Sequence, residues 1–485
     1  MEQTSEKVFK NRMLILFNVV LMTFMATLDS SIVNVALPKM AQQLSVSSEA
    51  ISWVVSSYLL VIVGTILIFG RLGDIIGKTR IFHFGIVIFT IGSLLCGISN
   101  SFILLIIARA IQGIGAAGAM ATNQGIITQV FPNNERGKAL GISGTFVALG
   151  SMAGPPLGGL IVDSFNWKYI FLINVPIGIF VYLLGLKILP KSQVTSKEKL
   201  DVKGAALFTI SIVSLFMALI IGEDYGYMHP IILAGFIIFI VSFIIFIFVE
   251  KKTEVPLLQF KIFQNRLFSL SIFCAFTSFI AISSSTIIMP FYLQNTLKYS
   301  PGFTGIILMV YPMILAVVAP ASGYLSDKIG SEFLTFIGLS LNSLGLFLMS
   351  SLNEYSSLVT LIIYIAIMSI GNGLFQSPNN SLTMSNAPRN MLGISGSVNA
   401  LIRNLGMISG ISIAVLILYS RMSHMIGYNV SDYVQGRDDV FIYGMRGAYI
   451  TAASICLFGA ALTAFRLYNK RRSLSRDVKQ QDDLS

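Results

Sequence analysis

The chain has 485 residues, of which 54% are hydrophobic and only 11% are charged, and its mean hydropathy is +0.78. Soluble domains usually carry about 25% charged residues, so this composition excludes an ordinary soluble enzyme and predicts an all-α integral membrane protein. The net charge of +11 does not indicate nucleic-acid binding. Most Lys and Arg residues fall in one set of loops and at the two termini, which is typical of cytoplasmic loops.

The first apolar run, near 13–37, is too long for a signal peptide and lacks a small-residue cleavage site, so it predicts a membrane-spanning helix that is retained. Similar runs then follow along the chain, giving about fourteen helices. Because this number is even and the basic loops mark the inside, we expect a multi-pass protein of the plasma membrane with both termini in the cytoplasm. A composition rich in Lys, Ile and Asn is typical of a bacterium with an AT-rich genome. The further runs lie near 50–70, 81–98, 101–122, 139–162, 168–189, 203–222, 230–249, 267–290, 303–325, 333–351, 356–377, 391–419 and 446–467.

Two sequence patterns occur twice along the chain. The charged, glycine-containing turn Gly70–Arg80 returns 253 residues later as Gly323–Gly330, and the Gly-Ile-Ser-Gly stretch at Gly141 returns at Gly393. Internal duplication of helical bundles is typical of secondary transporters. The pattern predicts two six-helix bundles with two inserted helices. The expected parts are 1–190 (first bundle), 191–265 (inserted helices and cytoplasmic connectors), 266–469 (second bundle) and 470–485 (cytoplasmic tail).

Asp29 is a carboxylate deep inside an apolar run, where a charge costs at least ~2.5–3.5 kcal/mol and usually marks an ion path. An apolar environment disfavours the charged form, so a proton-binding site is feasible near neutral pH. Arg109 should lie at nearly the same depth on a helix of opposite direction, and Gln112 shares its face. We therefore predict proton coupling through Asp29 and Arg109; packing alone is the alternative for each.

Arg403 shares a helix face with Asn399, and the apolar interiors of the second half contain no carboxylate. Arg403 must therefore pair across the bundle interface, face water or contact cargo, unless it only packs near the outer rim. Phe, Met and scattered polar residues suit an adaptable pocket. The expected substrate-binding residues are Asn34, Tyr58, Gln112, Asn123, Phe291, Tyr311, Asn379, Asn399 and Arg403.

The run from Gly150 to Gly159 has small residues at close spacing and two prolines, which suits a bent helix that seals and hinges at a bundle interface. Its expected hinge residues are Gly150, Gly154, Pro155, Pro156, Gly158 and Gly159. No spacing of His or Cys suits a metal site, and no phosphate-binding loop is present, so neither metals nor cofactors are expected.

These motifs resemble the major facilitator superfamily, and within it the fourteen-helix drug:proton antiporters. The turn Gly70–Arg80 resembles the superfamily's G-x-L-x-D-x-x-G signature, and Arg109-x-x-Gln112-Gly-x-Gly resembles the helix 4 motif. Gly150–Gly159 resembles the helix 5 motif of antiporters. Asp29–Pro38 and Trp167–Gly178 resemble stretches of the fourteen-helix exporters. The resemblance implies a conformational latch at Gly70, Gly73, Asp74, Gly77, Lys78 and Arg80.

The function that this resemblance implies is proton-coupled antiport, by alternating access, that exports small amphipathic compounds and gives drug resistance. The expected partners are protons, cargo and membrane lipids, with the chain working as a monomer and binding no nucleic acid. One negative charge on Asp29 and two positive charges on Arg109 and Arg403 give the interior a formal charge of +1. This charge favours neutral, monovalent or anionic cargo over dications. A dedicated transporter of one metabolite, such as an organic anion, a lipid or a nucleotide signal, is the alternative. A sensor without transport leaves Asp29 and Arg109 unexplained.

Overall fold

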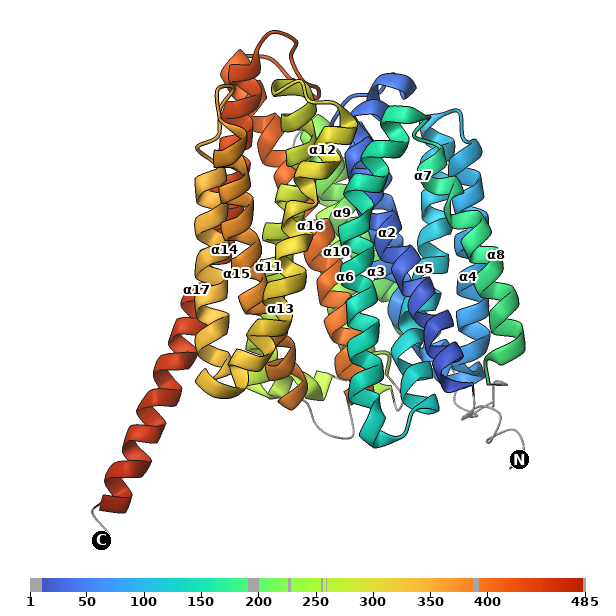
Figure 1. The fold of residues 1–485 in the computed structure, drawn as a ribbon, viewed down its shortest axis with the longest axis vertical. Coiled ribbons are helices and arrows are strands. Elements are labelled where there is room, and N and C mark those ends of the chain that lie inside the picture. The colour runs from blue at the N-terminus through green and yellow to red at the C-terminus, as the bar shows by residue number, and fades with distance from the viewer. Residues whose placement is uncertain are drawn as a thin grey trace.

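The computed structural model describes residues 11–190, 200–225, 228–253, 256–258, 260–386 and 392–482. Within these ranges the chain is helical and has no strand, as its composition predicts (Figure 1). Thirteen of the helices are long and apolar enough to cross a membrane. Helix α6 (Asn133–Ser164) lies alongside them and makes fourteen.

The helices before and after the middle of the chain form two groups. The first half comprises α2 (Arg12–Leu44), η1 (Ala50–Ser52), α3 (Trp53–Ile76), α4 (Lys78–Ile98), α5 (Phe102–Val130), α6, α7 (Tyr169–Leu172) and α8 (Asn174–Ile188). The second half comprises η2 (Phe260–Gln264), α11 (Arg266–Phe291), η3 (Tyr292–Thr296), α12 (Pro301–Leu308), α13 (Val310–Ile329), α14 (Ser331–Met349), α15 (Leu358–Ser385), α16 (Leu392–Ile426) and α17 (Asp438–Asp482).

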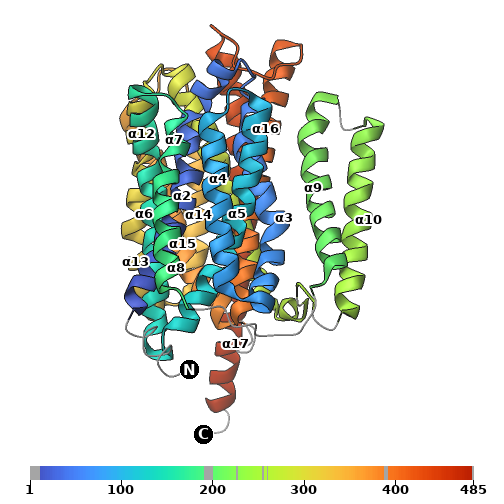
Figure 2. The same ribbon diagram turned by 90° about the vertical axis from the view of Figure 1, so that its right-hand side faces the viewer.

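Helices α9 (Val202–Tyr225) and α10 (Pro230–Lys252) form a hairpin that stands to one side of both halves (Figure 2). The hairpin contacts α3 of the first half and α16 of the second through α9. The Thr209 hydroxyl donates a hydrogen bond of 2.8 Å to the Gly64 carbonyl oxygen of α3. These two helices are the insertion that the sequence predicts, while the residue boundaries of the domains stay a prediction.

The two halves repeat each other in backbone detail. Gly77 and Gly330, which end the matching helices α3 and α13, have φ angles of 104° and 91°, a region that glycine adopts easily. Each half also packs a helix pair through glycine. A Cβ placed on Gly92 would lie 2.5 Å from the Gln112 nitrogen, and one on Gly345 would lie 2.7 Å from the Met368 nitrogen.

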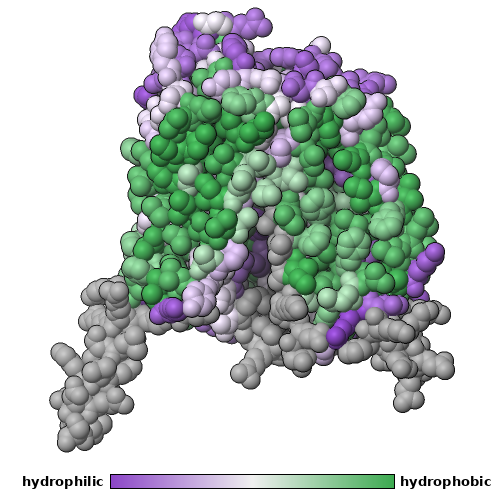
Figure 3. Space-filling model, in the orientation of Figure 1, coloured by the Kyte–Doolittle hydropathy of each residue, from purple (hydrophilic) through white to green (hydrophobic). Residues whose placement is uncertain are grey.

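The start of α2 and the end of α17 lie at the same end of the molecule, here called the terminal face; the opposite end is the distal face (Figure 1). At the distal face the halves touch. A Cβ placed on Gly159 of α6 would lie 2.5 Å from the Pro301 oxygen of α12, and Gln294 donates to the Val35 oxygen at 3.0 Å. Toward the terminal face, a seam of less hydrophobic residues deepens into a hollow between the halves (Figure 3).

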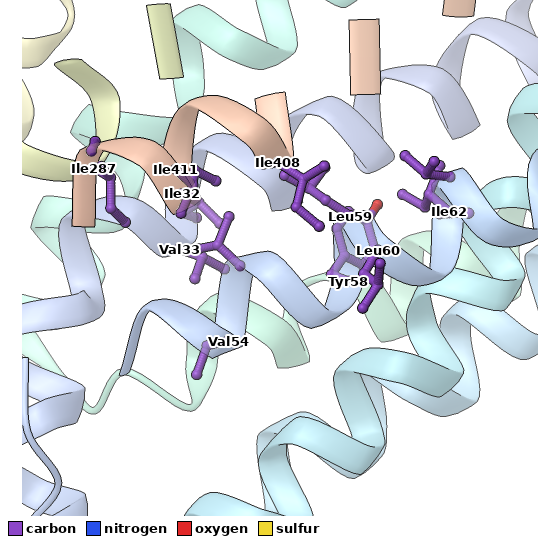
Figure 4. Close-up of a cluster of buried hydrophobic side chains, with 14 of the residues drawn as sticks. Ile32, Val33, Val54, Tyr58, Leu59, Leu60, Ile62, Ile287, Ile408 and Ile411 are labelled. Carbon is purple, nitrogen blue, oxygen red and sulfur yellow. The ribbon is translucent and has the colours of Figure 1, made fainter. Parts of the chain in front are cut away.

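Apolar side chains of four helices meet where the halves join. Ile32 and Val33 of α2 and Leu59 of α3 face Ile287 of α11 and Ile411 of α16 (Figure 4). Burial of such side chains contributes about 1.5–3 kcal/mol each where water is the alternative. The interface is therefore mostly apolar, and a charged side chain beside it is an exception.

The two tryptophans, Trp53 and Trp167, differ in burial. Trp53 begins α3 and is half-buried. Trp167, which precedes α7, is 1% exposed and packs edge-on against Phe171 with ring centroids 6.3 Å apart. It therefore belongs to the core of the first half.

Candidate functional site: a buried ion pair beside the interface

The predicted pair of Asp29 and Arg109 forms a direct ion pair inside the first half. Arg109 Nη1 donates to Asp29 Oδ2 at 2.6 Å, and both side chains are fully buried. Helices α2 and α5 place the two residues at the same depth, as their counted positions predict. Removal of one partner from such a pair leaves an uncompensated buried charge, which usually costs about 3–5 kcal/mol.

Two amides complete the shell of the carboxylate. Gln112 Nε2 donates to Asp29 Oδ1 at 2.8 Å, and Asn174 Nδ2 donates to the same oxygen at 2.9 Å. Gln112 also accepts from Arg109 Nη1 and donates to the Ser93 hydroxyl at 2.8 Å. Hydrogen bonds to a charged group contribute about 1.5–3 kcal/mol each, so this shell holds the Asp29 side chain in place and satisfies both of its oxygens.

Arg109 makes further contacts that hold its guanidinium in place. Its Nε donates to the Val54 carbonyl oxygen at 2.8 Å. Its Cζ lies 4.1 Å from the centroid of the Tyr58 ring and 5.6 Å from that of Phe171. A cation over an aromatic face gains about 2 kcal/mol when both are desolvated. Arg109 Nη2 makes no hydrogen bond within the described chain, which leaves its two N–H groups available for a rearranged network.

The second half has no equivalent of this pair. Because Gly92 faces Gln112 and Gly345 faces Met368, Met368 occupies the place of Gln112, and Ile365 that of Arg109. On the neighbouring helix pair, a Cβ on Gly158 would lie 2.7 Å from the Ile32 oxygen, and one on Gly410 would lie 2.5 Å from the Ile280 oxygen. Counting back three residues from each, Thr277 takes the place of Asp29. The ionisable network therefore belongs to one half of the duplicated fold.

A small cavity of about 50 Å³ lies between the halves, directly beside the ion pair. Its wall includes Asn34 and Tyr58, two of the predicted substrate-binding residues. Tyr58 thus lines the cavity and also stacks on Arg109, so one residue contacts both the cavity and the ion pair. The lining residues are Ser30, Asn34, Val55, Tyr58, Leu59, Ile282, Ser283, Thr286, Ile287, Met407 and Ile411, with no acidic side chain among them.

Other predicted substrate-binding residues use their polar groups to join helices. Gln112 belongs to the ion-pair network described above. Asn123 donates to the Thr23 hydroxyl, and Asn379 donates to the Ser271 oxygen at 3.1 Å.

The repeat matches Tyr311 to Tyr58, but the Tyr311 hydroxyl contacts the Asn372 amide rather than an arginine. Phe291 is buried at the end of α11, with 4% of its surface exposed. Tyr58 lines the cavity beside the ion pair, whereas Tyr311 and Phe291 are not among its lining residues.

Arg403 lies on α16, is half-buried, and makes no hydrogen bond or ion pair with any residue that the structure describes. It precedes the cavity-lining residues Met407 and Ile411 by one and two helical turns, so it shares their face. Asn399, one turn earlier, donates to the Asn380 side-chain oxygen at 3.2 Å. Arg403 and Asn399 therefore extend the cavity-lining face of α16 with polar groups.

The predicted latch residues surround the turn between α3 and α4. Lys78 Nζ and Asp74 Oδ1 form an exposed ion pair of 2.8 Å. Gly77 has the positive φ angle that ends α3, and Arg80 is exposed. A Cβ on Gly73 would lie 2.9 Å from the Thr122 methyl carbon, whereas one on Gly70 would meet nothing within 4 Å. In this conformation Gly73 therefore allows close helix approach, whereas Gly70 faces open space.

The predicted hinge residues all lie on α6, where their glycines face α2 and α12. Gly150 and Gly154 face Thr27 and Ser31 of α2, and Gly158 faces Ile32. Pro155 approaches Gly305 of α12, while Pro156 follows it in the same turn and α6 continues through both prolines. Gly159 contacts the start of α12. This helix therefore lies at the junction of the two halves.

The sequence analysis missed Ser93 and Asn174 as parts of the site. Asn174 stands within the stretch Trp167–Gly178 that resembles the exporters, and that resemblance is the signal that could have assigned it. Ser93 carries no such signal, because a lone serine in an apolar helix is common. Both residues can be assigned to the site only when the positions of α4 and α8 around α2 are known.

Comparisons with known proteins agree with this architecture. The family model of the Major Facilitator Superfamily matches residues 19–411. The riboflavin transporter RibZ of Clostridioides difficile is 34% identical over 467 residues, covering 96% of this chain and all of the relative. Multidrug resistance protein 3 of Bacillus subtilis is 33% identical over 419 residues, covering 85% of this chain and 80% of the relative.

Among solved structures, a bacterial homologue of the human lysosomal transporter Spinster, in an inward-facing and unoccupied conformation, superposes with a TM-score of 0.66. It is 18% identical and covers 93% of this chain and 96% of its own, a likeness that shows the fold. The chain belongs to the Major Facilitator Superfamily and is a multi-pass membrane transporter.

Proposed function

We propose that the chain is a proton-coupled antiporter that exports small amphipathic compounds across the plasma membrane of a bacterium, with both termini in the cytoplasm. The observation that carries this proposal is the Asp29–Arg109 pair, which is fully buried and is connected to the cavity through Tyr58, a residue that contacts Arg109 and lines the cavity. Multidrug transporters among the relatives, such as multidrug resistance protein 3, support the cargo class.

In this mechanism Asp29 exchanges a proton for its contact with Arg109. A proton on the carboxylate removes one charge of the pair, which frees the guanidinium to move against the Tyr58 ring. Because Tyr58 lines the cavity, the movement changes the cargo site. Deprotonation restores the ion pair and with it the arrangement described here, in which the halves touch at the distal face.

A dedicated flavin transporter is the second candidate, favoured by the full-length similarity to RibZ. The cavity wall has apolar, amide and hydroxyl groups but no acidic side chain, which suits a neutral or anionic ring compound better than a cation. The chain is proposed to work as a monomer in either case, since one chain contains both halves.

The test is transport into inverted vesicles or from proteoliposomes under an imposed pH gradient, with a fluorescent monovalent cation and riboflavin as parallel cargos. We expect gradient-driven transport in the wild type and its loss in Asp29→Asn, which keeps the shape but not the charge. Arg421→Gln, at the exposed distal end of α16, is a charge-changing control. Equal gradient-driven transport in Asp29→Asn and wild type contradicts the proposal. The preferred cargo separates the two candidates.

A further inference from the structure

We propose that Arg403 is an anion-binding subsite, so that the cargo is an amphipathic organic anion whose carboxylate, sulfonate or phosphate group contacts this guanidinium. This inference rests on the proposed transport function and names its cargo class. It begins from the fact that Arg403 makes no hydrogen bond or ion pair with the described residues although it is half-buried.

The other charges buried in the two halves already have partners. Arg109 is bound to Asp29, and Arg466 of α17 donates to the hydroxyls of Ser271 and Thr335 at 3.1 and 2.6 Å. A charge that is partly removed from water and has no counter-charge favours a ligand or water that compensates it. Arg403 is therefore the cation that a cargo anion would reach.

Position supports the same conclusion. Arg403, Met407 and Ile411 follow one another at single-turn spacing on α16, and the latter two line the cavity against Tyr58 and Leu59. A cargo whose apolar body lies against these residues would extend one turn along α16, about 6 Å, to place an anionic group at Arg403. The Asn399–Asn380 amide pair lies one turn further and offers neutral hydrogen-bonding groups.

The cavity of about 50 Å³ is too small for such a cargo, because ligand pockets for drug-sized molecules are usually about 300–1,000 Å³. The cargo must therefore extend from the cavity into the hollow that opens toward the terminal face (Figure 3). Arg403 lies on the way, since α16 runs from the terminal face to the distal face and reaches Arg403 before Met407.

The experiment compares two probes that differ in one anionic group. 8-Anilinonaphthalene-1-sulfonate and N-phenyl-1-naphthylamine share a ring system, and only the first carries a sulfonate. Their binding to the full chain in lipid nanodiscs is measured by fluorescence titration, with empty nanodiscs subtracted. We expect Arg403→Gln to weaken binding of the sulfonate about tenfold and to leave binding of the neutral probe unchanged, with Arg403→Lys in between.

The matched control is Arg421→Gln, which removes an exposed arginine from the same helix and should change neither titration. Thermal unfolding of each variant by circular dichroism confirms folding, and Arg403→Lys keeps the test valid if Arg403→Gln does not fold. The proposal is overturned if both probes weaken equally, if the sulfonate binds wild type and variants alike, or if wild type does not bind it. Asp29→Asn separates the two hypotheses: it should lose gradient-driven transport while keeping the preference for the sulfonate.

Discussion

Three neighbours donate hydrogen bonds to the two carboxylate oxygens of Asp29 inside an apolar bundle. Arg109 supplies the opposite charge at Oδ2, while Gln112 and Asn174 supply amides to Oδ1. The guanidinium compensates the charge of the carboxylate, and the two amides satisfy its second oxygen.

Asn174→Leu should weaken gradient-driven transport and lower the stability of the chain by about 1–3 kcal/mol. Loss of the amide removes a hydrogen bond to the buried Asp29 carboxylate, and hydrogen bonds to charged groups contribute about 1.5–3 kcal/mol. Thermal unfolding of wild type and variant, followed by transport in proteoliposomes, is the measurement. Wild-type stability and transport in Asn174→Leu would show that the amide does not support the ion pair.

Tyr58→Phe should keep coupled transport, because the ring that lies 4.1 Å from Arg109 remains. Tyr58→Leu should lose cargo-dependent proton movement while retaining a folded chain, because the apolar volume stays but the cation–π contact does not. Proton uptake upon cargo addition, followed with a pH-sensitive dye inside proteoliposomes, separates the two. If the Phe and Leu variants behaved identically, the aromatic ring could not be the group that couples Arg109 to the cargo cavity.

Among the elements, α6 joins the halves by close contact rather than by specific side chains. Its glycines face α2 on one side and α12 on the other, and Gly159 and Gly305 allow backbones of different halves to approach each other. Helix pairs packed in this way in membranes depend on small residues at the contact. A small increase in volume at such a position should therefore change the balance between conformations.

Gly159→Ala should destabilise the closed distal face by about 1–3 kcal/mol, the usual cost of overpacking, since a Cβ there would lie 2.5 Å from the Pro301 oxygen. We expect a single cysteine placed at Asn34 in the cavity wall to react faster with a membrane-impermeant maleimide added from the distal side. The matched control is Gly118→Ala within the first half, whose Cβ would lie at an ordinary contact distance of 3.4 Å from its nearest neighbour, Gly85. An unchanged reaction rate in Gly159→Ala would show that α12 shifts to accommodate the added methyl group while the distal face stays closed.

The sequence predicts the fourteen helices, the inserted pair and the duplicated plan, because hydropathy and repeated motifs depend on local residues and their spacing. It also predicts the Asp29–Arg109 pair, since two charges in apolar helices at one depth have few other partners. It does not predict the role of Tyr58 beneath Arg109, the addition of Asn174 and Ser93, or the burial of Trp167. Those features depend on how helices rotate against one another, which neutral side chains do not encode in their spacing.

For the whole molecule, the contacts between halves indicate one end of a conformational cycle. Besides Gln294 and Val35, the Ser48 hydroxyl and backbone meet the Asp432 carboxylate, and the Glu49 nitrogen donates to the Ser431 oxygen at 3.1 Å. Each of these contacts lies at the distal face. If the halves rock about a central site, they must break during every cycle.

Locking this face should therefore stop transport. The double variant Ser48→Cys with Asp432→Cys is expected to lose transport upon oxidation and to recover it with a reductant. Each single variant should stay active under both conditions. The native cysteines Cys96, Cys274 and Cys456 are buried and should not interfere. Full activity of a completely oxidised double variant, verified by mass spectrometry, would contradict a cycle that opens the distal face.

The apolar and hydroxyl residues that replace the ion pair in the second half, Ile365, Met368 and Thr277, determine how much charge one transport cycle moves. With a single proton site, the proposed exporter carries one positive charge inward for each neutral molecule released. With a monovalent organic anion as cargo, the same cycle moves two. A membrane voltage of 100 mV then contributes about 2.3 kcal/mol to each cycle in the first case and about 4.6 kcal/mol in the second. Export of anions would thus draw twice the driving force from voltage, and would persist in cells that have lost their pH gradient.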